Sequence, residues 1–186
     1  MSYLRTFLPW IVFAAVPSGS WQWGALAALV VSLAVIAQQV RAGTGLDALI
    51  IELGSAAFFA VLSVVAFADP HSGLHDYSAA VSSATLAAVA GLSLAVRRPF
   101  TLGIAKRSTP PEVWGLKPFI RVNVVITAVW TAAFAVTAAL LAAEAHAGHG
   151  HSTTALLIQI AGFVVPMVFT VRYAAHARAR AQQLAH

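Results

Sequence analysis

The sequence predicts an all-α polytopic membrane protein, a bundle of six transmembrane helices with both termini on the cytoplasmic side. Three observations lead to this prediction. Of the 186 residues, 60% are hydrophobic and only 9% are charged, whereas a soluble domain carries about 25% charged residues. The apolar residues fall in segments that approach the roughly 20 residues a helix needs to cross the hydrocarbon layer. When these segments are threaded as six spans, all eleven Lys and Arg residues fall on one side.

The helices are expected at about 3–16, 24–40, 46–68, 78–96, 119–143 and 153–171. The first is short, contains Pro9 and is followed by a Pro-Ser-Gly-Ser turn, so it also resembles a signal peptide. We expect it to be retained, because the next helix begins almost at once and Trp21 and Trp23 suit an interfacial turn. No polar half could form a second domain, so residues 1–186 are expected to form a single membrane domain.

The distribution of basic residues predicts the orientation. The expected outer loops at 17–23, 69–77 and 144–152 contain no Lys or Arg. Because Lys and Arg concentrate in cytoplasmic loops, the basic side is predicted to be inside, as in a bacterial cytoplasmic (inner) membrane. Anionic lipid headgroups are the expected partner of these residues, and nucleic acid is not expected despite the net charge of +5.

The longest cytoplasmic loop, 97–118, carries basic and aromatic residues. Thr109 and Glu112 have the spacing of a capping box, which predicts a short helix that begins at Pro110 and leads into the fifth span. Phe100 is expected at the level of the lipid headgroups. The loop either anchors the inner face on lipid or docks a partner protein. The residues predicted for this surface are Arg97, Arg98, Lys106, Arg107 and Trp114.

Glu52 is the one carboxylate predicted well inside the hydrocarbon, about two turns from the inner end of its helix. Such a group is costly and faces either a partner or a cavity. Polar residues expected at similar depth are Gln38, Gln39, Arg41, Arg121 and Asn123. One interpretation is a Glu52–Arg ion pair that locks helices together, and the other is a proton or cation site. Small residues expected at close helix contacts are Gly54, Ser55, Ala87, Gly91 and Ser93.

Five histidines fall in two of the outer loops. The second outer loop carries His71 and His75, flanked by Asp69 and Asp76, and the third carries His146, His149 and His151. Neutral imidazoles bind transition metals, so these loops are a candidate zinc or copper site. The alternative is a solvated loop rich in Gly and His.

The motifs of soluble and membrane enzymes are largely missing. The chain has no cysteine, which excludes thiolate catalysis, Fe–S clusters and Cys-type zinc sites. It also lacks a phosphate-binding glycine loop, a nucleophile elbow and an H-E-x-x-H helix. We therefore expect no enzyme, and a metal-dependent membrane enzyme built on the five outer histidines is the weakest alternative.

Short motifs along the chain resemble the bacterial intracellular septation protein A family. They are Phe7-Leu8-Pro9-Trp10, Val40-Arg41, Arg98-Pro99-Phe100, Pro111-Glu112-Val113-Trp114 and Arg121-Val122-Asn123. The resemblance implies a non-catalytic inner-membrane protein of the cell envelope, linked to division or elongation, with envelope or division proteins as candidate partners. Self-association into a homo-oligomer is a further candidate for such a protein. The histidine-rich outer loops depart from the family pattern. A small cation or proton transporter or channel, using Glu52 and the outer histidines, is the alternative function.

Overall fold

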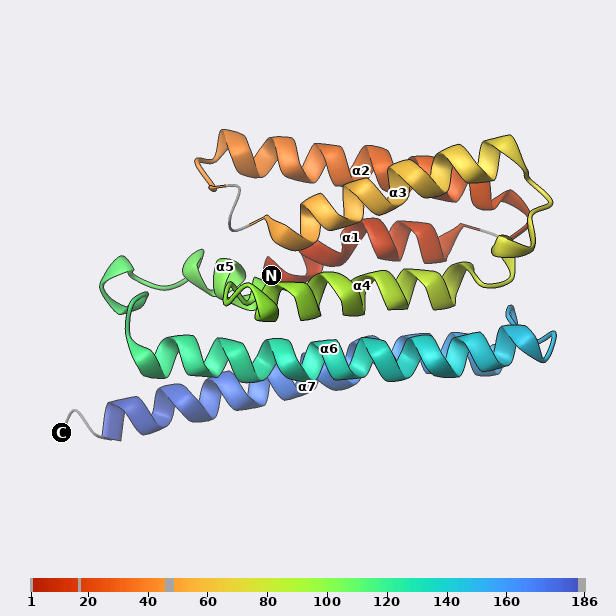
Figure 1. The fold of residues 1–186 in the computed structure, drawn as a ribbon. Helices are drawn as coiled ribbons and strands as arrows, with labels where there is room; N and C mark the ends of the chain where they lie inside the picture. Colours follow the sequence, from red (N-terminus) through yellow and green to blue (C-terminus); the bar gives the residue numbers. More distant parts are fainter. Residues whose placement is uncertain (1, 17, 46–48, 184–186) are drawn as a thin grey trace.

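The computed structural model describes residues 2–16, 18–45 and 49–183, and this part of the chain is helical with no strand. The predicted all-α class is therefore confirmed (Figure 1). The helices are α1 (Ser2–Ala15), α2 (Trp21–Arg41), α3 (Ile50–Ala68), α4 (Ser78–Ala95), α5 (Phe100–Lys106), α6 (Lys117–His146) and α7 (Thr153–Gln183). Short 3-10 turns lie at Ser18–Ser20, Gly73–His75 and Pro111–Val113.

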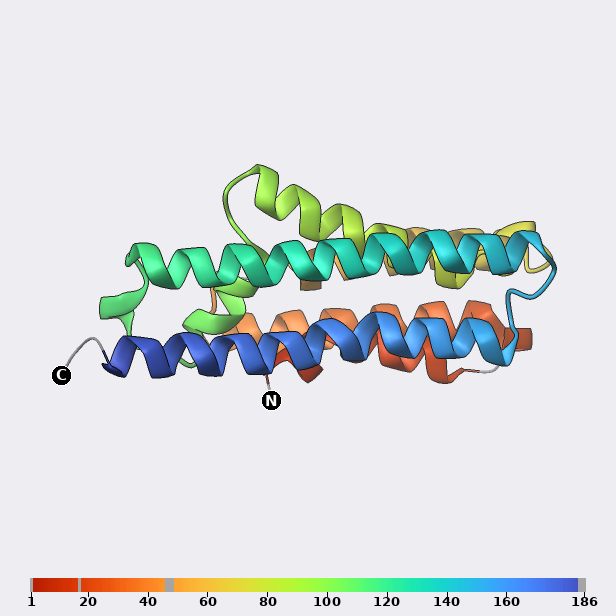
Figure 2. The same ribbon diagram turned by 90° about the horizontal axis from the view of Figure 1, so that it is seen from below.

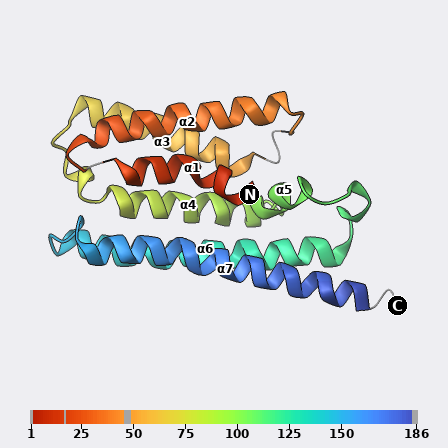
Figure 3. The same cartoon turned by 180° about the vertical axis from the view of Figure 1, so that it is seen from behind.

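Five of these helices, α2, α3, α4, α6 and α7, are long and apolar enough to cross a membrane, and α1 contains a shorter apolar stretch. The prediction of helices able to span a membrane is confirmed to that extent. At 1.5 Å per residue, the 30-residue α6 is about 45 Å long, more than the roughly 30 Å of a hydrocarbon core. Accordingly, α6 and α7 project as a pair past the ends of α2, α3 and α4 (Figures 1 and 3).

The helices pack mainly against antiparallel neighbours. α1 and α3 pack along α2, α4 packs along α6, and α6 and α7 form a long hairpin (Figures 1 and 2). A cluster of aromatic rings joins α1 to α6 and α7. The ring of Phe7 on α1 stacks on Trp130 of α6 at 5.0 Å between centroids, and Phe163 of α7 meets Phe7 edge-on at 4.9 Å.

The two ends of the bundle differ in chemistry. The N-terminal end of α1, the C-terminal ends of α2, α4 and α7, the whole of α5 and the start of α6 lie at one end (Figure 1). All eleven Lys and Arg residues are on these segments or on the connections from α4 to α5 and from α5 to α6. The connections α1–α2, α3–α4 and α6–α7 lie at the opposite end, which therefore has histidines but no Lys or Arg.

The basic segment between α4 and α6 differs from its prediction. It contains α5, which was not expected, and only a 3-10 turn at Pro111–Val113 where a helix from Pro110 was expected. The capping box does not form, because the Thr109 hydroxyl donates to the carbonyl of Ala105 at 2.8 Å. Phe100 is 3% exposed and packs near Trp130 in the core, so its predicted place at the lipid headgroups is wrong.

Glu52 lies nearer to the helix end than predicted. α3 begins at Ile50, so Glu52 is in the first helical turn rather than two turns in. The predicted start of this helix, residues 46–48, lies outside the described residues. A carboxylate in the first turn interacts favourably with the positive end of the helix dipole, which lowers the cost of its burial.

Candidate functional sites at the two ends of the bundle

At the basic end, three side chains donate hydrogen bonds to the same oxygen of Glu52. Oε1 accepts from Thr6 Oγ1 at 2.9 Å, from Gln39 Nε2 at 2.9 Å and from Arg107 Nη2 at 3.2 Å. The donors come from α1, from α2 and from the C-terminal end of α5. Glu52 is 3% exposed and Arg107 is 17% exposed, so this is a largely buried ion pair. We call these four residues the Glu52 cluster.

The ion-pair partner of Glu52 is Arg107 rather than Arg41 or Arg121, which are both exposed. Gln38 is also exposed, while its neighbour Gln39 turns inward to the carboxylate. Asn123 is buried but donates to the carbonyl of Phe119 in its own helix, at 2.9 Å. Of the residues predicted to surround Glu52, only Gln39 is in the cluster.

Arg107 reaches Glu52 because α5 is buried in the basic end of the bundle. The hydroxyl of Thr101 lies 2.9 Å from the carbonyl of Asn123 and 2.8 Å from the Thr127 hydroxyl, so it bonds to α6 twice. The backbone N–H of Phe100 donates to Ser93 Oγ of α4 at 3.2 Å. Phe100, Thr101 and Ile104 are the buried face of this helix. Their one- and four-residue spacing is the sequence signal that would have revealed α5.

The layer above the Glu52 cluster is aromatic. Trp10 Nε1 donates to Ser55 Oγ at 2.7 Å, and the Trp10 ring stacks on Phe58 at 5.1 Å and lies 4.7 Å from Phe59. Trp10 of α1 and Ser55 of α3 are thus hydrogen bonded to each other, next to the rings of Phe58 and Phe59. This geometry is typical of a structural lock between helices, and it gives a transport path from Glu52 little support.

The exposed basic surface is smaller than predicted. Arg97 and Arg98 are exposed after α4, and Arg97 has φ +57° at the end of that helix. Lys106 Nζ lies 5.2 Å from the ring centre of Trp114, a cation–π distance. Arg107 is turned into the bundle. Arg97, Arg98, Lys106 and Trp114 therefore remain as the candidate lipid or partner surface.

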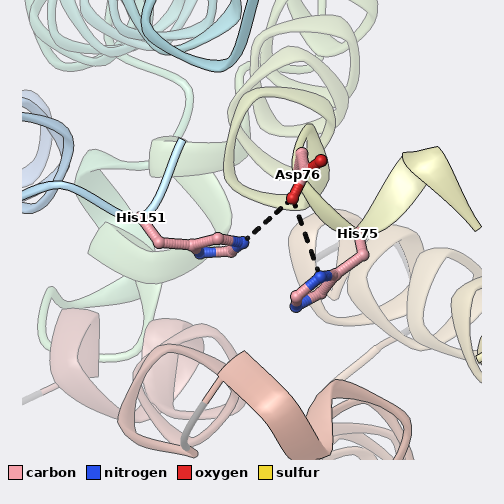
Figure 4. A group of neighbouring side chains, drawn as sticks. All are labelled: His75, Asp76 and His151. Carbon is pink, nitrogen blue, oxygen red and sulfur yellow. Dashed lines mark ion pairs between the residues drawn. The ribbon is translucent and has the colours of Figure 1, made fainter. Parts of the chain in front are cut away.

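At the opposite end, two histidines from different loops approach one carboxylate. His75 Nδ1 lies 3.8 Å and His151 Nε2 lies 3.5 Å from Asp76 Oδ1. Figure 4 shows both rings directed at Asp76, with His75 and Asp76 on the α3–α4 connection and His151 on the α6–α7 connection. The centroids of the His75 and His151 rings are 4.6 Å apart. We call this group the outer triad.

Neighbouring residues hold the two loops in place. Trp21 Nε1 donates to the carbonyl of Pro70 at 3.0 Å, and its ring lies 5.4 Å from that of His75. Gly150 lets the loops approach closely, since a Cβ there would lie 2.6 Å from the Asp76 carbonyl oxygen. Glu144 accepts from Ser152 Oγ at 3.2 Å, which braces the α6–α7 loop next to His151.

The structure brings together two of the five predicted histidines with Asp76, one of the two aspartates that flank His71 and His75 in the sequence. His71, His146 and His149 are exposed and outside the group of ligand atoms that lie within 4.8 Å of one another. Asp76 directly follows His75 in the sequence, and this adjacency is the sequence feature that places its carboxylate near the histidine. The pairing of loops depends on tertiary structure, so the sequence could not single out His151.

One cavity lies beside the two histidines of the outer triad, and a second adjoins it. The first, of about 400 Å³, is bordered by His75, His151, Trp21 and the end of α1. The second, of about 330 Å³, lies deeper between α1, α4, α6 and α7 and is mostly apolar. They share lining residues, among them Phe13, Leu156 and Gln159. His75 and His151 therefore border a hollow that reaches toward the middle of the bundle.

No family model, curated protein or solved structure matches the chain.

Proposed function

We propose that this chain is a non-catalytic protein of the bacterial cytoplasmic membrane that crosses six times, with both termini inside. In this arrangement α1 is the sixth crossing, beside the five longer apolar helices. The collection of all eleven Lys and Arg residues at one end of the bundle supports it. Basic residues favour the cytoplasmic side, so the histidine-bearing loops face outward.

We further propose that it acts as a scaffold in the cell envelope, in the manner that its resemblance to the septation protein A family implies. The observation that carries this proposal is the fixed position of the cytoplasmic segment. Arg107 bonds to Glu52 and Thr101 bonds to α6, so α5 is held against the membrane helices. Arg97, Arg98 and Lys106 are thereby presented on an ordered support, which reduces the entropy lost when a partner binds.

The surface has the chemistry of a site for acidic partners. Two exposed guanidinium groups and an ammonium group beside an indole ring offer charge, hydrogen bonding and an aromatic face. Such a surface binds the acidic segment of a division or elongation protein, with anionic lipid headgroups around it. The transport alternative has less support, because Glu52 already accepts three hydrogen bonds within the bundle.

The test is recovery of envelope proteins with the full chain after cross-linking in bacterial cells. The informative variant is Arg97→Gln/Arg98→Gln/Lys106→Gln, which leaves Arg107 in its ion pair. The matched control is Arg172→Gln/Arg178→Gln/Arg180→Gln, which removes the same charge from α7 at the same end of the bundle. Both variants should remain monodisperse in detergent, since all three residues of the control and both arginines of the test surface are exposed.

We expect a reproducible set of division or elongation proteins with the wild-type chain and with the α7 control, and its loss with the loop variant. Equal loss in both variants would mean that net charge matters rather than this surface. Unchanged recovery with the loop variant would contradict the scaffold proposal.

A further inference from the structure

We propose that the outer triad of His75, Asp76 and His151 binds one divalent transition-metal ion of the class that includes Zn²⁺. The proposal concerns the end of the molecule opposite the scaffold surface and does not depend on it. It rests on the separations between ligand atoms, on the hydrogen bonding of His75 and on the way the two loops are held.

The separations within the triad fit ligands of one ion better than direct hydrogen bonds. The nitrogen-to-oxygen distances of 3.8 Å and 3.5 Å exceed the 2.7–3.2 Å of an N–H···O hydrogen bond. Two ligands of a tetrahedral ion, each bonded at about 2.0–2.1 Å, lie about 3.4 Å apart. All three ligand atoms are within 4.8 Å of one another, so small side-chain movements complete the geometry.

The imidazole ring of His75 makes no hydrogen bond within the described residues, whereas its backbone N–H donates to the carbonyl of Ser72 at 2.9 Å. Its Nδ1 is 3.8 Å from Asp76, and its Nε2 is buried without a hydrogen-bond partner. The residue is 24% exposed and lies beside the ring of Trp21. A polar ring in such a place costs free energy unless its nitrogens are engaged. Coordination of Nδ1 to a cation engages one of the two ring nitrogens and accounts for the direction of Nδ1 toward Asp76, while Nε2 stays without a partner among the described residues.

The ligand set defines the class of ion. Two imidazoles and one carboxylate are the donors that zinc and other first-row divalent metals accept, and hard cations such as Mg²⁺ prefer oxygen ligands alone. Three protein ligands leave a fourth position for water or a small molecule. Both histidines border the 400 Å³ cavity, so a fourth ligand can reach the ion from there.

The experiment uses the untagged full chain, purified in detergent and freed of metal by a chelator that is then removed. Equilibrium dialysis against Zn²⁺ with elemental analysis gives the stoichiometry. Titration with Co²⁺ reports the ligand geometry through its visible absorption, and competition by Zn²⁺ gives relative affinity. The test variants are His75→Ala, Asp76→Asn and His151→Ala. The matched control is His71→Ala/His146→Ala/His149→Ala, which removes exposed histidines from the same loops.

We expect one equivalent of Zn²⁺ and one tetrahedral Co²⁺ spectrum with the wild type and with the control. Each test variant should weaken binding by more than the roughly 10–100-fold that loss of a supporting hydrogen bond costs a metal site. Asp76→Asn guards against misfolding, because that side chain is 61% exposed. Absence of stoichiometric binding, or equal weakening in the control, would overturn the proposal and leave the histidines as a solvated loop.

A second variant tests the positions of the ligands without removing any of them. Gly150→Ala places a Cβ 2.6 Å from the Asp76 carbonyl oxygen, which must push the two loops apart. We expect it to weaken Co²⁺ binding and change its spectrum. Gly73→Ala, in the loop that carries His75, meets nothing within 4 Å and should bind as the wild type does. Identical spectra for the two variants would contradict a site that spans the loops.

Discussion

Glu52 shows how a single carboxylate is accommodated in an apolar bundle. Burying an ion costs several kcal/mol even after relaxation, and the cost is offset here by Arg107, by two neutral donors and by the helix N-terminus. Because each compensation comes from a different segment, the side chain ties α1, α2, α3 and α5 together. Its contribution is to specify one arrangement of these segments more than to add stability.

Removal of Arg107 tests this interpretation at the residue scale. Arg107→Ala leaves the Glu52 carboxylate buried without its counter-charge, so we expect the free energy of unfolding to fall by about 3–5 kcal/mol. Glu52→Leu/Arg107→Met removes both charges and should be less destabilised than the Arg107→Ala variant. The measurement is the thermal midpoint of the detergent-solubilised chain. Arg41→Ala, at an exposed arginine on α2, should have little effect. A double variant that is destabilised as much as Arg107→Ala, or more, would contradict the interpretation that the loss comes from an unpaired buried charge.

At the scale of elements, α5 is a seven-residue helix that depends on its neighbours. Helices this short are not stable alone in water, so the contacts of Phe100, Thr101 and Ile104 hold it in place. The consequence is that small changes in its buried face should release the whole segment between α4 and α6.

Thr101→Val keeps the shape of that side chain and removes its hydroxyl. The carbonyl of Asn123 and the hydroxyl of Thr127 lose a partner, so we expect the free energy of unfolding to fall by about 1–3 kcal/mol. We also expect faster hydrogen exchange of the backbone amides over residues 97–118. Thr85→Val is the control, since that hydroxyl bonds only to the carbonyl of Val81 in its own helix. If exchange over 97–118 is unchanged, then α5 is held by other contacts.

The hairpin of α6 and α7 depends on the absence of a side chain at Gly162. A Cβ there would clash with the side chain of Thr137, so Gly162→Ala should separate the helices and cost about 1–3 kcal/mol through overpacking. Thr137→Ala should restore most of the loss in thermal midpoint when combined with it. Gly91→Ala is the control, because its Cβ would meet Thr131 at an ordinary 3.4 Å. Failure of the combined variant to recover would place the strain elsewhere.

At the scale of the whole molecule, the proposed six crossings place each connection on a defined side. The chain has no cysteine, so single cysteines can be introduced without a background. Ser72→Cys and Ala147→Cys should react with a membrane-impermeant maleimide in intact cells, whereas Ser108→Cys and Ala179→Cys should react only after the membrane is opened. Reaction of Ser108→Cys in intact cells would reverse the proposed orientation.

Spans could be predicted from the sequence because their length and apolar character are local properties. The start of α6 at Lys117, by contrast, came two residues before its prediction, since a helix end depends on neighbouring turns. α5 was missed because its sequence signal is limited to the spacing of three residues, Phe100, Thr101 and Ile104, in a segment rich in basic residues. The partner of Glu52 could not be predicted, as Arg107 is brought to it by the burial of α5. Likewise, the meeting of His75 with His151 depends on how the two loops fold.

The short length of α1 has a consequence for the lipid around the protein. Its 14 residues extend about 21 Å, and Leu8 and Ile11 on it are exposed, whereas α6 and α7 are more than twice as long. In the six-crossing arrangement the shortest span is α1, so the bilayer must thin beside this helix. The cost is a fraction of a kcal/mol for each ångström of mismatch. Lipids with short acyl chains relieve this deformation. The free-energy cost of mismatch at α1 should therefore depend on membrane thickness more strongly than that at the longer α6 and α7.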